Sequence, residues 1–252
     1  MKLGLSPGTG ARPRVRPAFY ALPAGGWRDY ATLLHPPYTL WHLSYVIWGA
    51  ALAGAHHYDR LAATLVAFLL AVGVAAHALD ELQDRPLGTR ISPGVLVVLA
   101  SLSLGGAVLI GVLGAVEISP WLLVFVAFGL FIAPAYNLEW FGGRFHSDIW
   151  FAVSWGSFPL LTAYFVTAER LSTTAALGAA MAFTLSLAQR TLSSRVRGLR
   201  RRARSIEGKV HYSDGTVEDI DRRWATASDE RALLLMSFSI FAGGLAVLMA
   251  LQ

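Results

Sequence analysis

Seven separate apolar runs, each about long enough to cross a bilayer, are the feature that most limits how this chain can fold. A helix needs about 17–25 predominantly apolar residues to span the hydrocarbon core of a membrane. Short segments rich in charge, glycine or proline, such as HHYDR and RPLGTR, separate the runs. The runs cover about residues 37–55, 61–83, 92–115, 118–138, 148–168, 171–189 and 231–251. The sequence therefore predicts an all-α fold, a polytopic transmembrane helical bundle of about seven spans.

The composition agrees with this interpretation. Hydrophobic residues make up 55% of the chain and charged residues 15%, against roughly 25% charged residues in soluble domains. The mean hydropathy is +0.50. The chain has no cysteine, which excludes disulfides, thiolate metal sites and cysteine nucleophiles.

The basic residues predict the orientation. If the N-terminus is cytoplasmic and the sides alternate, 19 of the 21 Lys and Arg residues fall on the cytoplasmic side, and only Arg60 and Arg170 lie outside. Cytoplasmic loops of membrane proteins carry this excess of positive charge. We therefore expect a protein of the cell (inner) membrane with its C-terminus outside, whose net charge of +5 serves the membrane rather than nucleic acid.

Two polar regions flank or interrupt the spans. Residues 1–30 lack the continuous apolar core of a signal peptide, and we interpret them as a basic cytoplasmic tail that becomes interfacial near Trp27. Residues 31–252 form the predicted membrane domain, with a polar cytoplasmic insert at about 190–230. Within this insert we expect a helix through the arginines, and then a hairpin in KVHYSDGTV that turns at Asp214–Gly215.

Acidic residues follow the second apolar run directly, in the stretch HALDELQDRPLGTR. His77, Asp80, Glu81 and Asp84 have the spacing i, i+3, i+4, i+7, which favours one helix face. Carboxylates this close together repel one another unless a cation or a basic side chain neutralises them. Mg²⁺ is commonly held by one or two carboxylates together with substrate phosphates. The simpler alternative is that Arg85 and Arg90 form ion pairs with these carboxylates.

Four stretches of the chain, in order, resemble the UbiA superfamily of intramembrane prenyltransferases. HALDELQDRPLGTRIS is similar to the family's first aspartate-rich motif, with Asp80 and Asp84 at the positions of its last two aspartates. YNLEWFGGRFHSD and WFAVSWGSFPLLTAYF resemble the segments that follow the fourth span and form the fifth. RDYATLLHPPYTLWHLSYVIWGAALA is similar to the first helix, so that the resemblance covers about residues 28–200.

The resemblance implies a helical bundle that transfers a prenyl group from a polyprenyl diphosphate to an aromatic or lipid-like acceptor with the help of Mg²⁺. Asp80 and Asp84 would be the catalytic residues. The implied metal ligands and diphosphate contacts are Asp80, Glu81 and Asp84 for Mg²⁺, and Asn137, Arg144, Arg190 and Arg195 for the diphosphate.

The sequence also departs from the family. The second aspartate-rich motif is missing, because no acidic residue occurs between Leu171 and Ala203, and Gln189, Arg190, Arg195 and Arg197 stand there instead. The family usually has nine spans, about two more than predicted here. In one interpretation the arginines contact the diphosphate directly, because guanidinium groups match phosphate oxygens.

A second interpretation is a catalytically degenerate relative that binds a lipid or pigment, or serves as a subunit beside a partner membrane protein. In that case the arginines would pair with Asp80, Glu81 and Asp84 and close the old site. A third interpretation is a pigment or haem protein that uses the histidines His35, His42, His77 or His146.

Overall fold

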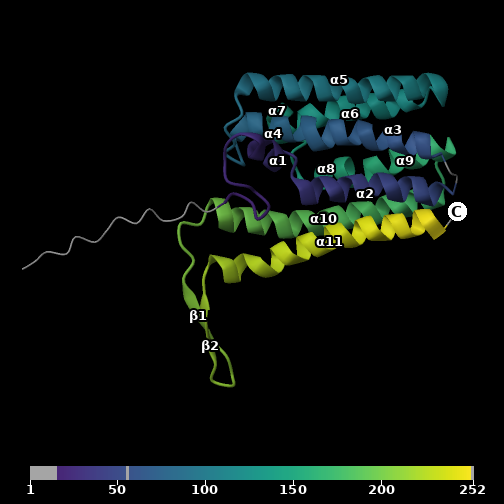
Figure 1. The fold of residues 1–252 in the computed structure, drawn as a ribbon. Coiled ribbons are helices and arrows are strands. Elements are labelled where there is room, and N and C mark those ends of the chain that lie inside the picture. The colour runs from purple at the N-terminus through teal and green to yellow at the C-terminus, as the bar shows by residue number, and fades with distance from the viewer. Residues whose placement is uncertain (1–15, 55–56, 251–252) are drawn as a thin grey trace, which may run out of the picture.

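The computed structural model describes residues 16–54 and 57–250. Its main body is a bundle of long helices that run side by side (Figure 1). It begins with the short helix α1 (Trp27–Leu33), the 18-residue helix α2 (Pro36–Ala53) and the continuous helix formed by α3 (Tyr58–Phe68), η1 (Leu69–Ala76) and α4 (His77–Asp84). The η segments are π-helical turns within longer helices.

The remaining elements complete the bundle and its polar extension. Next along the chain come α5 (Pro93–Glu117), α6 (Leu122–Asn137), the short α7 (Trp140–Gly143), and the continuous α8 (Asp148–Phe151), η2 (Ala152–Ser157) and α9 (Phe158–Ala168). They are followed by α10 (Thr173–Arg201), the strands β1 (Gly208–His211) and β2 (Val217–Ile220), and α11 (Arg222–Ala250).

Serine side chains begin three of these helices as expected for N-caps. Ser92, Ser147 and Ser172 each accept a hydrogen bond from the backbone N–H three residues later. Such a bond satisfies one of the free N–H groups that every helix start exposes. These caps place the starts of α5, α8 and α10 close to the starts of the predicted apolar runs.

Each predicted apolar run lies in a helix. The prediction of about seven spans is nevertheless wrong, because fewer of these helices are long enough and apolar enough to cross a membrane. In the described part of the chain, the helices long and apolar enough to cross a membrane are Tyr58–Asp84, Pro93–Glu117, Asp148–Ala168 and Arg222–Ala250. The apolar helix α6 is shorter, with 16 residues. The described chain is therefore an all-α protein with four helices that could cross a membrane.

Helix α2 shows most clearly why a predicted apolar run need not be a membrane-crossing helix. Its buried residues include the polar side chains of Thr39, His42 and Ser44. These side chains lie against protein rather than lipid, because α2 packs between α9 and α11. A helix enclosed by its neighbours does not need a fully apolar surface.

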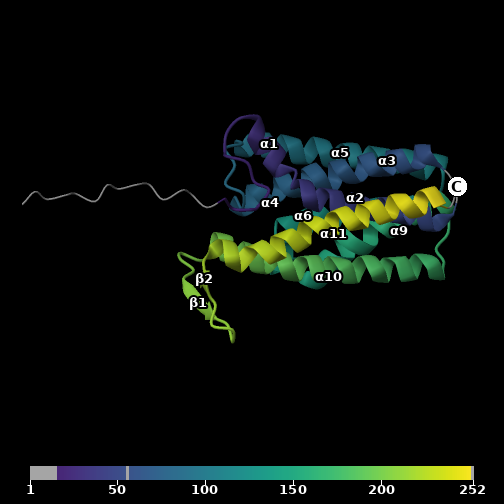
Figure 2. The ribbon, with the colours of Figure 1, turned by 60° about the horizontal axis from the view of Figure 1, so that its bottom comes forward.

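Small residues set how closely the central helices approach. A Cβ atom at Gly49 of α2 would overlap the carbonyl oxygen of Leu160 in α9. A Cβ atom at Gly156 of η2 would lie 2.5 Å from Ser186 Oγ in α10. Such small residues let the backbones of membrane helices come into contact. Figure 2 shows α11 lying along α2 and α10, to which it also packs.

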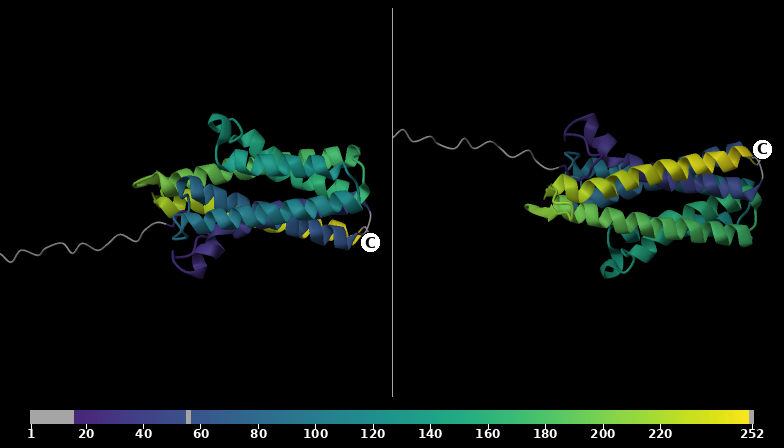
Figure 3. Two further views of the ribbon diagram at one scale, coloured as in Figure 1. Left: turned by 90° about the horizontal axis from the view of Figure 1, so that it is seen from above. Right: turned by 90° about the horizontal axis from the view of Figure 1, so that it is seen from below.

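The ends of the bundle differ. At one end, α10 leads into the β1–β2 hairpin, which extends beyond the helices (Figure 1). The strands pair antiparallel from Gly208↔Ile220 to His211↔Val217, and Gly215 has a positive φ of 85° at the turn. The predicted hairpin and the continuation of the helix through the arginines are confirmed. At the same end, α1 and the region of α7 project from opposite sides of the bundle (Figure 3).

Candidate functional site

A cavity of about 620 Å³ opens within the bundle at the end that carries the hairpin. Its walls come from α2, η1, α4, α6, α8, η2 and α10, together with the segment that precedes α1. Of the residues predicted to form a site, four line this cavity: Asp80, Asp84, Asn137 and Arg190. The fold therefore brings together residues that lie more than one hundred positions apart in the sequence.

Asp80 and Asp84 lie one helical turn apart on α4 and both face the cavity. Within residues 16–54 and 57–250, neither carboxylate has a hydrogen bond or an ion pair with another side chain or backbone group. Arg85 does not pair with them, because its guanidinium donates to the carbonyl oxygen of Ile91 at 2.6 Å. Both acidic side chains are therefore open to a bound cation.

Glu81 faces away from this cavity and has a different role. Its side chain is fully buried, and its carboxylate accepts hydrogen bonds from the backbone N–H of Leu87 at 2.9 Å and of Thr89 at 2.8 Å. The Thr89 hydroxyl donates a third hydrogen bond at 2.9 Å. These contacts fasten the loop after α4, so the expectation that Glu81 binds metal is replaced by a structural role.

The arginines of α10 divide between the cavity and the surface. Arg190 lines the cavity, donates from Nε to Asp148 Oδ1 at 2.8 Å and lies over the Phe151 ring. Arg195 lies outside the cavity and pairs with Asp229 at 2.7 Å. Arg144 is exposed and also lies outside the cavity. The structure therefore does not place Arg144 and Arg195 where diphosphate contacts were expected.

Three cavity arginines, Arg197, Arg201 and Arg202, were not among the predicted site residues. Arg197 donates to the hydroxyls of Ser193 and Ser194, at 3.1 and 2.9 Å, and Arg201 donates to the carbonyl oxygen of Pro17 at 3.4 Å. Neither has a carboxylate partner among the described residues. Their positions, seven and eleven residues after Arg190, return to the same face of a helix, whereas Arg195 lies on another face. Helical periodicity could have found them.

The cavity also contains polar atoms that lack a partner. Among the described residues that line it, His35 Nε2, Tyr136 OH and Gln189 Oε1 are buried and make no hydrogen bond. Asn137 uses its amide nitrogen, which donates to the carbonyl oxygen of Ala133 at 2.7 Å. Buried polar groups normally have a protein, water or ligand partner. The cavity thus presents unmet hydrogen-bonding capacity as well as charge.

The histidines near the cavity are mostly occupied by other parts of the protein. Ring nitrogens of His42, His77 and His146 lie within hydrogen-bond distance of backbone carbonyl oxygens, and the His35 and His77 rings are 4.0 Å apart between centroids. In the part of the chain that the structure describes, no group of three or more His, Cys, Asp or Glu side chains could hold a metal ion. This arrangement favours structural contacts over axial ligation of a haem.

The segment before α1 covers part of the cavity. Pro17, Phe19 and Tyr20 line it, and the Tyr20 ring contacts the rings of His35 and Tyr38 at 5.5 and 5.6 Å. This region was expected to belong to a tail of residues 1–30, of which residues 1–15 lie outside the described part. The segment from residue 16 onward instead packs on the bundle.

Asp80 and Asp84 fit an Mg²⁺ ion only if other groups complete its shell. Mg²⁺ prefers six oxygen ligands, and it is commonly held by one or two carboxylates plus phosphates and water. The two open carboxylates meet the protein's part of that requirement. The arginines on the facing helix suit phosphate oxygens, because a guanidinium offers several donors in a fixed plane.

Fold and cavity together define a class: an all-α bundle with four helices long and apolar enough to cross a membrane, and with a charged cavity at its basic end. In comparisons with known proteins, the chain matches no family model, no curated protein and no solved structure.

Proposed function

We propose that this protein is a UbiA-like membrane prenyltransferase that binds a polyprenyl diphosphate and passes its prenyl group to an aromatic or lipid-like acceptor. The observation that carries the proposal is the placement of charge in one cavity. Among the described residues, Asp80 and Asp84 on α4 have no partner, and Arg197 and Arg201 on α10 have no carboxylate partner. A diphosphate with a divalent cation is complementary to both sets.

The carboxylates and the arginines would divide the work on the diphosphate. Asp80 and Asp84 would hold Mg²⁺, which supplies neutralising charge as the C–O bond to the diphosphate breaks. Arg197 and Arg201 would donate hydrogen bonds to phosphate oxygens on the opposite side. In this arrangement the arginines replace the second aspartate-rich motif, whose positions in α10 contain no acidic residue.

The apolar side of the cavity suits the prenyl group. Val72, Ala76, Phe151 and Trp155 line it on the side toward the middle of the bundle. These apolar and aromatic surfaces exclude water from the carbon that would be attacked, which limits simple hydrolysis. The unpartnered polar atoms of Tyr136 and Gln189 would remain available to a polar acceptor.

We also propose the orientation that the charge distribution favours: an inner-membrane protein with the cavity facing the cytoplasm and the C-terminal end of α11 outside. Arg60 and Arg170 lie at the opposite end from the arginines of α10, which supports this assignment.

Because the chain has no native cysteine, the orientation can be tested with single cysteines, one at Ser213 in the hairpin and one at Glu117 at the other end of the bundle. Labelling of intact cells by an impermeant maleimide at residue 117 and not at 213 is expected. The reverse pattern would invert the proposed orientation.

Binding of a radiolabelled polyprenyl diphosphate to the purified protein tests the proposed function. We expect binding that requires Mg²⁺ and is lost in Asp84→Ala, while Asp219→Ala, which alters an exposed hairpin carboxylate, binds like the wild type. Binding that is insensitive to both Mg²⁺ and Asp84 would refute the proposed site. No binding to the folded wild-type protein would refute the proposed function.

A second candidate function is a catalytically degenerate relative that binds a lipid or pigment, or acts as a membrane subunit beside a partner. The arginines in α10, where the family has its second acidic motif, favour this alternative. Release of diphosphate separates the two functions: a transferase consumes the bound substrate when an acceptor is present. A degenerate relative would bind the prenyl diphosphate without releasing diphosphate. The closure of the site by ion pairs between α10 and α4, which the degenerate interpretation predicted, is not present among the described residues.

A further inference from the structure

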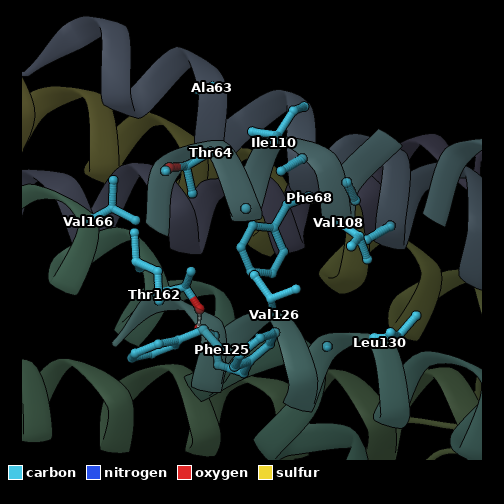
Figure 4. A pocket seen from close by; sticks show the side chains of 18 of the residues that line it. Ala63, Thr64, Phe68, Val108, Ile110, Phe125, Val126, Leu130, Thr162 and Val166 are labelled. Atoms are coloured by element: carbon cyan, nitrogen blue, oxygen red, sulfur yellow. Dashed lines mark hydrogen bonds between the residues drawn. The ribbon is translucent and has the colours of Figure 1, made fainter. Parts of the chain in front are cut away.

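A second cavity, of about 130 Å³, lies between α3, α5, α6 and α9. It reaches from Arg60, Ile118 and Val166 at the end remote from the hairpin to Ala71 and Phe158 near the middle of the bundle. Figure 4 shows side chains from these helices converging on the space, with Phe68 and Phe125 among them. We refer to it as the apolar slot. It shares no lining residue with the charged cavity.

Apart from Arg60 at one end, the slot has no polar side chain without a partner among the described residues. Its two threonine hydroxyls are used within their own helices, both at 2.7 Å: Thr64 donates to the carbonyl oxygen of Arg60, and Thr162, labelled in Figure 4, donates to that of Phe158. None of the buried polar atoms without a partner in the described chain belongs to a residue of the slot. A polar ligand would therefore lose its hydrogen bonds with water and gain none. The slot suits hydrocarbon.

The shape of the slot suits a single chain. Arg60 and Ala71 are eleven residues apart on one continuous helix, so the slot extends for roughly 16 Å along the bundle. Small side chains at Ala63 and Ala67 leave the space on this helix, and Gly111 and Gly114 leave it on α5. A volume of about 130 Å³ spread over that length is narrow.

A cation stands at the end of the slot that is remote from the hairpin. The Nη1 of Arg60 donates to the carbonyl oxygen of Val166 at 3.0 Å and to Glu169 Oε1 at 2.9 Å. The other guanidinium nitrogens have no hydrogen bond within the described residues, and the side chain keeps 20% of its surface exposed. An arginine can serve several acceptors at once. The free edge of the guanidinium is suited to a phosphate oxygen.

We propose that the apolar slot binds one hydrocarbon chain of a bilayer phospholipid, with the phosphate of that lipid at Arg60. The helices that form most of the slot are long and apolar enough to cross a membrane, so lipid chains surround it at high concentration. Apolar lining, single-chain width and a guanidinium at the outer rim together match a phospholipid. The site is independent of the proposed prenyl transfer, because it uses other residues at the opposite end of the bundle.

Photocrosslinking in nanodiscs tests the site. The probe is a phosphatidylglycerol with a diazirine at the end of one acyl chain, and peptide mapping locates the label. We expect label concentrated on peptides of α3, α5 and α6 that line the slot. In Ala67→Phe, which fills the slot, that label should fall about tenfold, because losing the burial of about two methylene groups has an effect of this size. The matched control is Ala127→Phe, which places the same ring on an exposed position of α6 outside the slot and should label like the wild type.

Three further measurements keep the outcome decisive. Excess unlabelled phosphatidylglycerol should compete with the probe on the wild-type protein, which needs no variant to fold. Arg60→Gln should reduce labelling by the anionic probe more than labelling by a phosphatidylcholine probe. Label spread evenly over the exposed helices, or equal in Ala67→Phe and Ala127→Phe, would overturn the site. Displacement of the probe by a polyprenyl diphosphate but not by phospholipid would overturn the assigned occupant and indicate a prenyl chain instead.

Discussion

Asp80 on α4 and Arg197 on α10 line the same cavity, yet they form no ion pair in the part of the chain that the structure describes. Opposite charges inside a protein attract strongly because the surroundings screen them poorly. Their separation is therefore most readily understood if a ligand with both a cation and an anion fits between them. A diphosphate with its metal has this character. The same relationship distinguishes the cavity from an old site closed by salt bridges.

Arg197→Gln is expected to weaken binding of a polyprenyl diphosphate about tenfold or more, because a hydrogen bond to a charged group is worth about 1.5–3 kcal/mol. Equilibrium binding with radiolabelled ligand at fixed Mg²⁺ measures the change. Arg195→Gln is the matched control, since Arg195 lies outside the cavity and pairs with Asp229. Equal effects of the two substitutions would show that only the overall positive charge of α10 matters, and would contradict a specific role for Arg197.

Glu81→Gln is expected to lower the free energy of unfolding by about 1.5–3 kcal/mol. The fully buried carboxylate accepts three hydrogen bonds from Leu87 and Thr89, and the amide that replaces it would point N–H groups at some of these donors. The midpoint of thermal unfolding in detergent should therefore fall. Asp84→Asn should leave that midpoint unchanged, because Asp84 is exposed and has no partner among the described residues. A stable Glu81→Gln protein would mean that the loop is held by other contacts.

Most of the fold could be predicted from the apolar runs, and the error in the number of spans has a physical cause. Every run forms a helix, because a long apolar segment in a membrane must satisfy its backbone hydrogen bonds internally. Whether such a helix meets lipid or protein depends on its neighbours, which the run itself does not encode. The buried His42 and Ser44 in α2 illustrate this, since their side chains bond to the backbone carbonyls of Trp155 and Leu40.

The candidate site was only partly predictable, because part of it depends on how helices and loops pack rather than on residue spacing. The spacing of Asp80 and Asp84 places them on one face, whereas Glu81 is turned away by about 100° along the helix. The left-handed conformation of Arg85, with φ of 50°, brings the following loop back to Glu81, and no sequence pattern announced that turn. The facing position of α10 also depends on tertiary packing, although the periodicity of Arg190, Arg197 and Arg201 was available in the sequence.

Gly49→Ala is expected to destabilise the bundle by about 1–3 kcal/mol, the usual cost of overpacking a close contact. The added Cβ would overlap the carbonyl oxygen of Leu160, a backbone atom that has little freedom to move. Thermal unfolding in detergent measures the loss. Gly105→Ala supplies the control on α5, where nothing lies within 4 Å of an added Cβ. It should be neutral or slightly stabilising, because alanine is the better helix former. Similar midpoints for both variants would contradict the close approach of α2 and α9.

The hairpin turn should respond to pH through Asp214. The hydroxyl and the backbone N–H of Thr216 both donate to Asp214 Oδ1, at 2.7 and 2.9 Å, and these hydrogen bonds lower the pKa of the carboxyl group below its ordinary value. A group whose pKa is lowered by folding stabilises the folded form above its unfolded pKa. That contribution is lost as the pH falls through the lowered value. The turn should therefore be intact at neutral pH and weaken only in acid.

Selective ¹⁵N labelling of threonine measures this directly, because the Thr216 amide shift reports its hydrogen bond to Asp214. We expect the shift to titrate with a midpoint below the value for an unfolded aspartate, about 3.9. In Asp214→Asn the side chain still offers an oxygen to the Thr216 N–H, but it no longer ionises, so this titration should disappear. The Tyr212 hydroxyl donates to Glu218 at 2.6 Å and not to Asp214. We therefore expect the Thr216 amide shift to follow the titration of Asp214. A midpoint at or above the unfolded value would show that the two hydrogen bonds do not form in solution, and that the turn is held by Gly215 and the strand pairing instead.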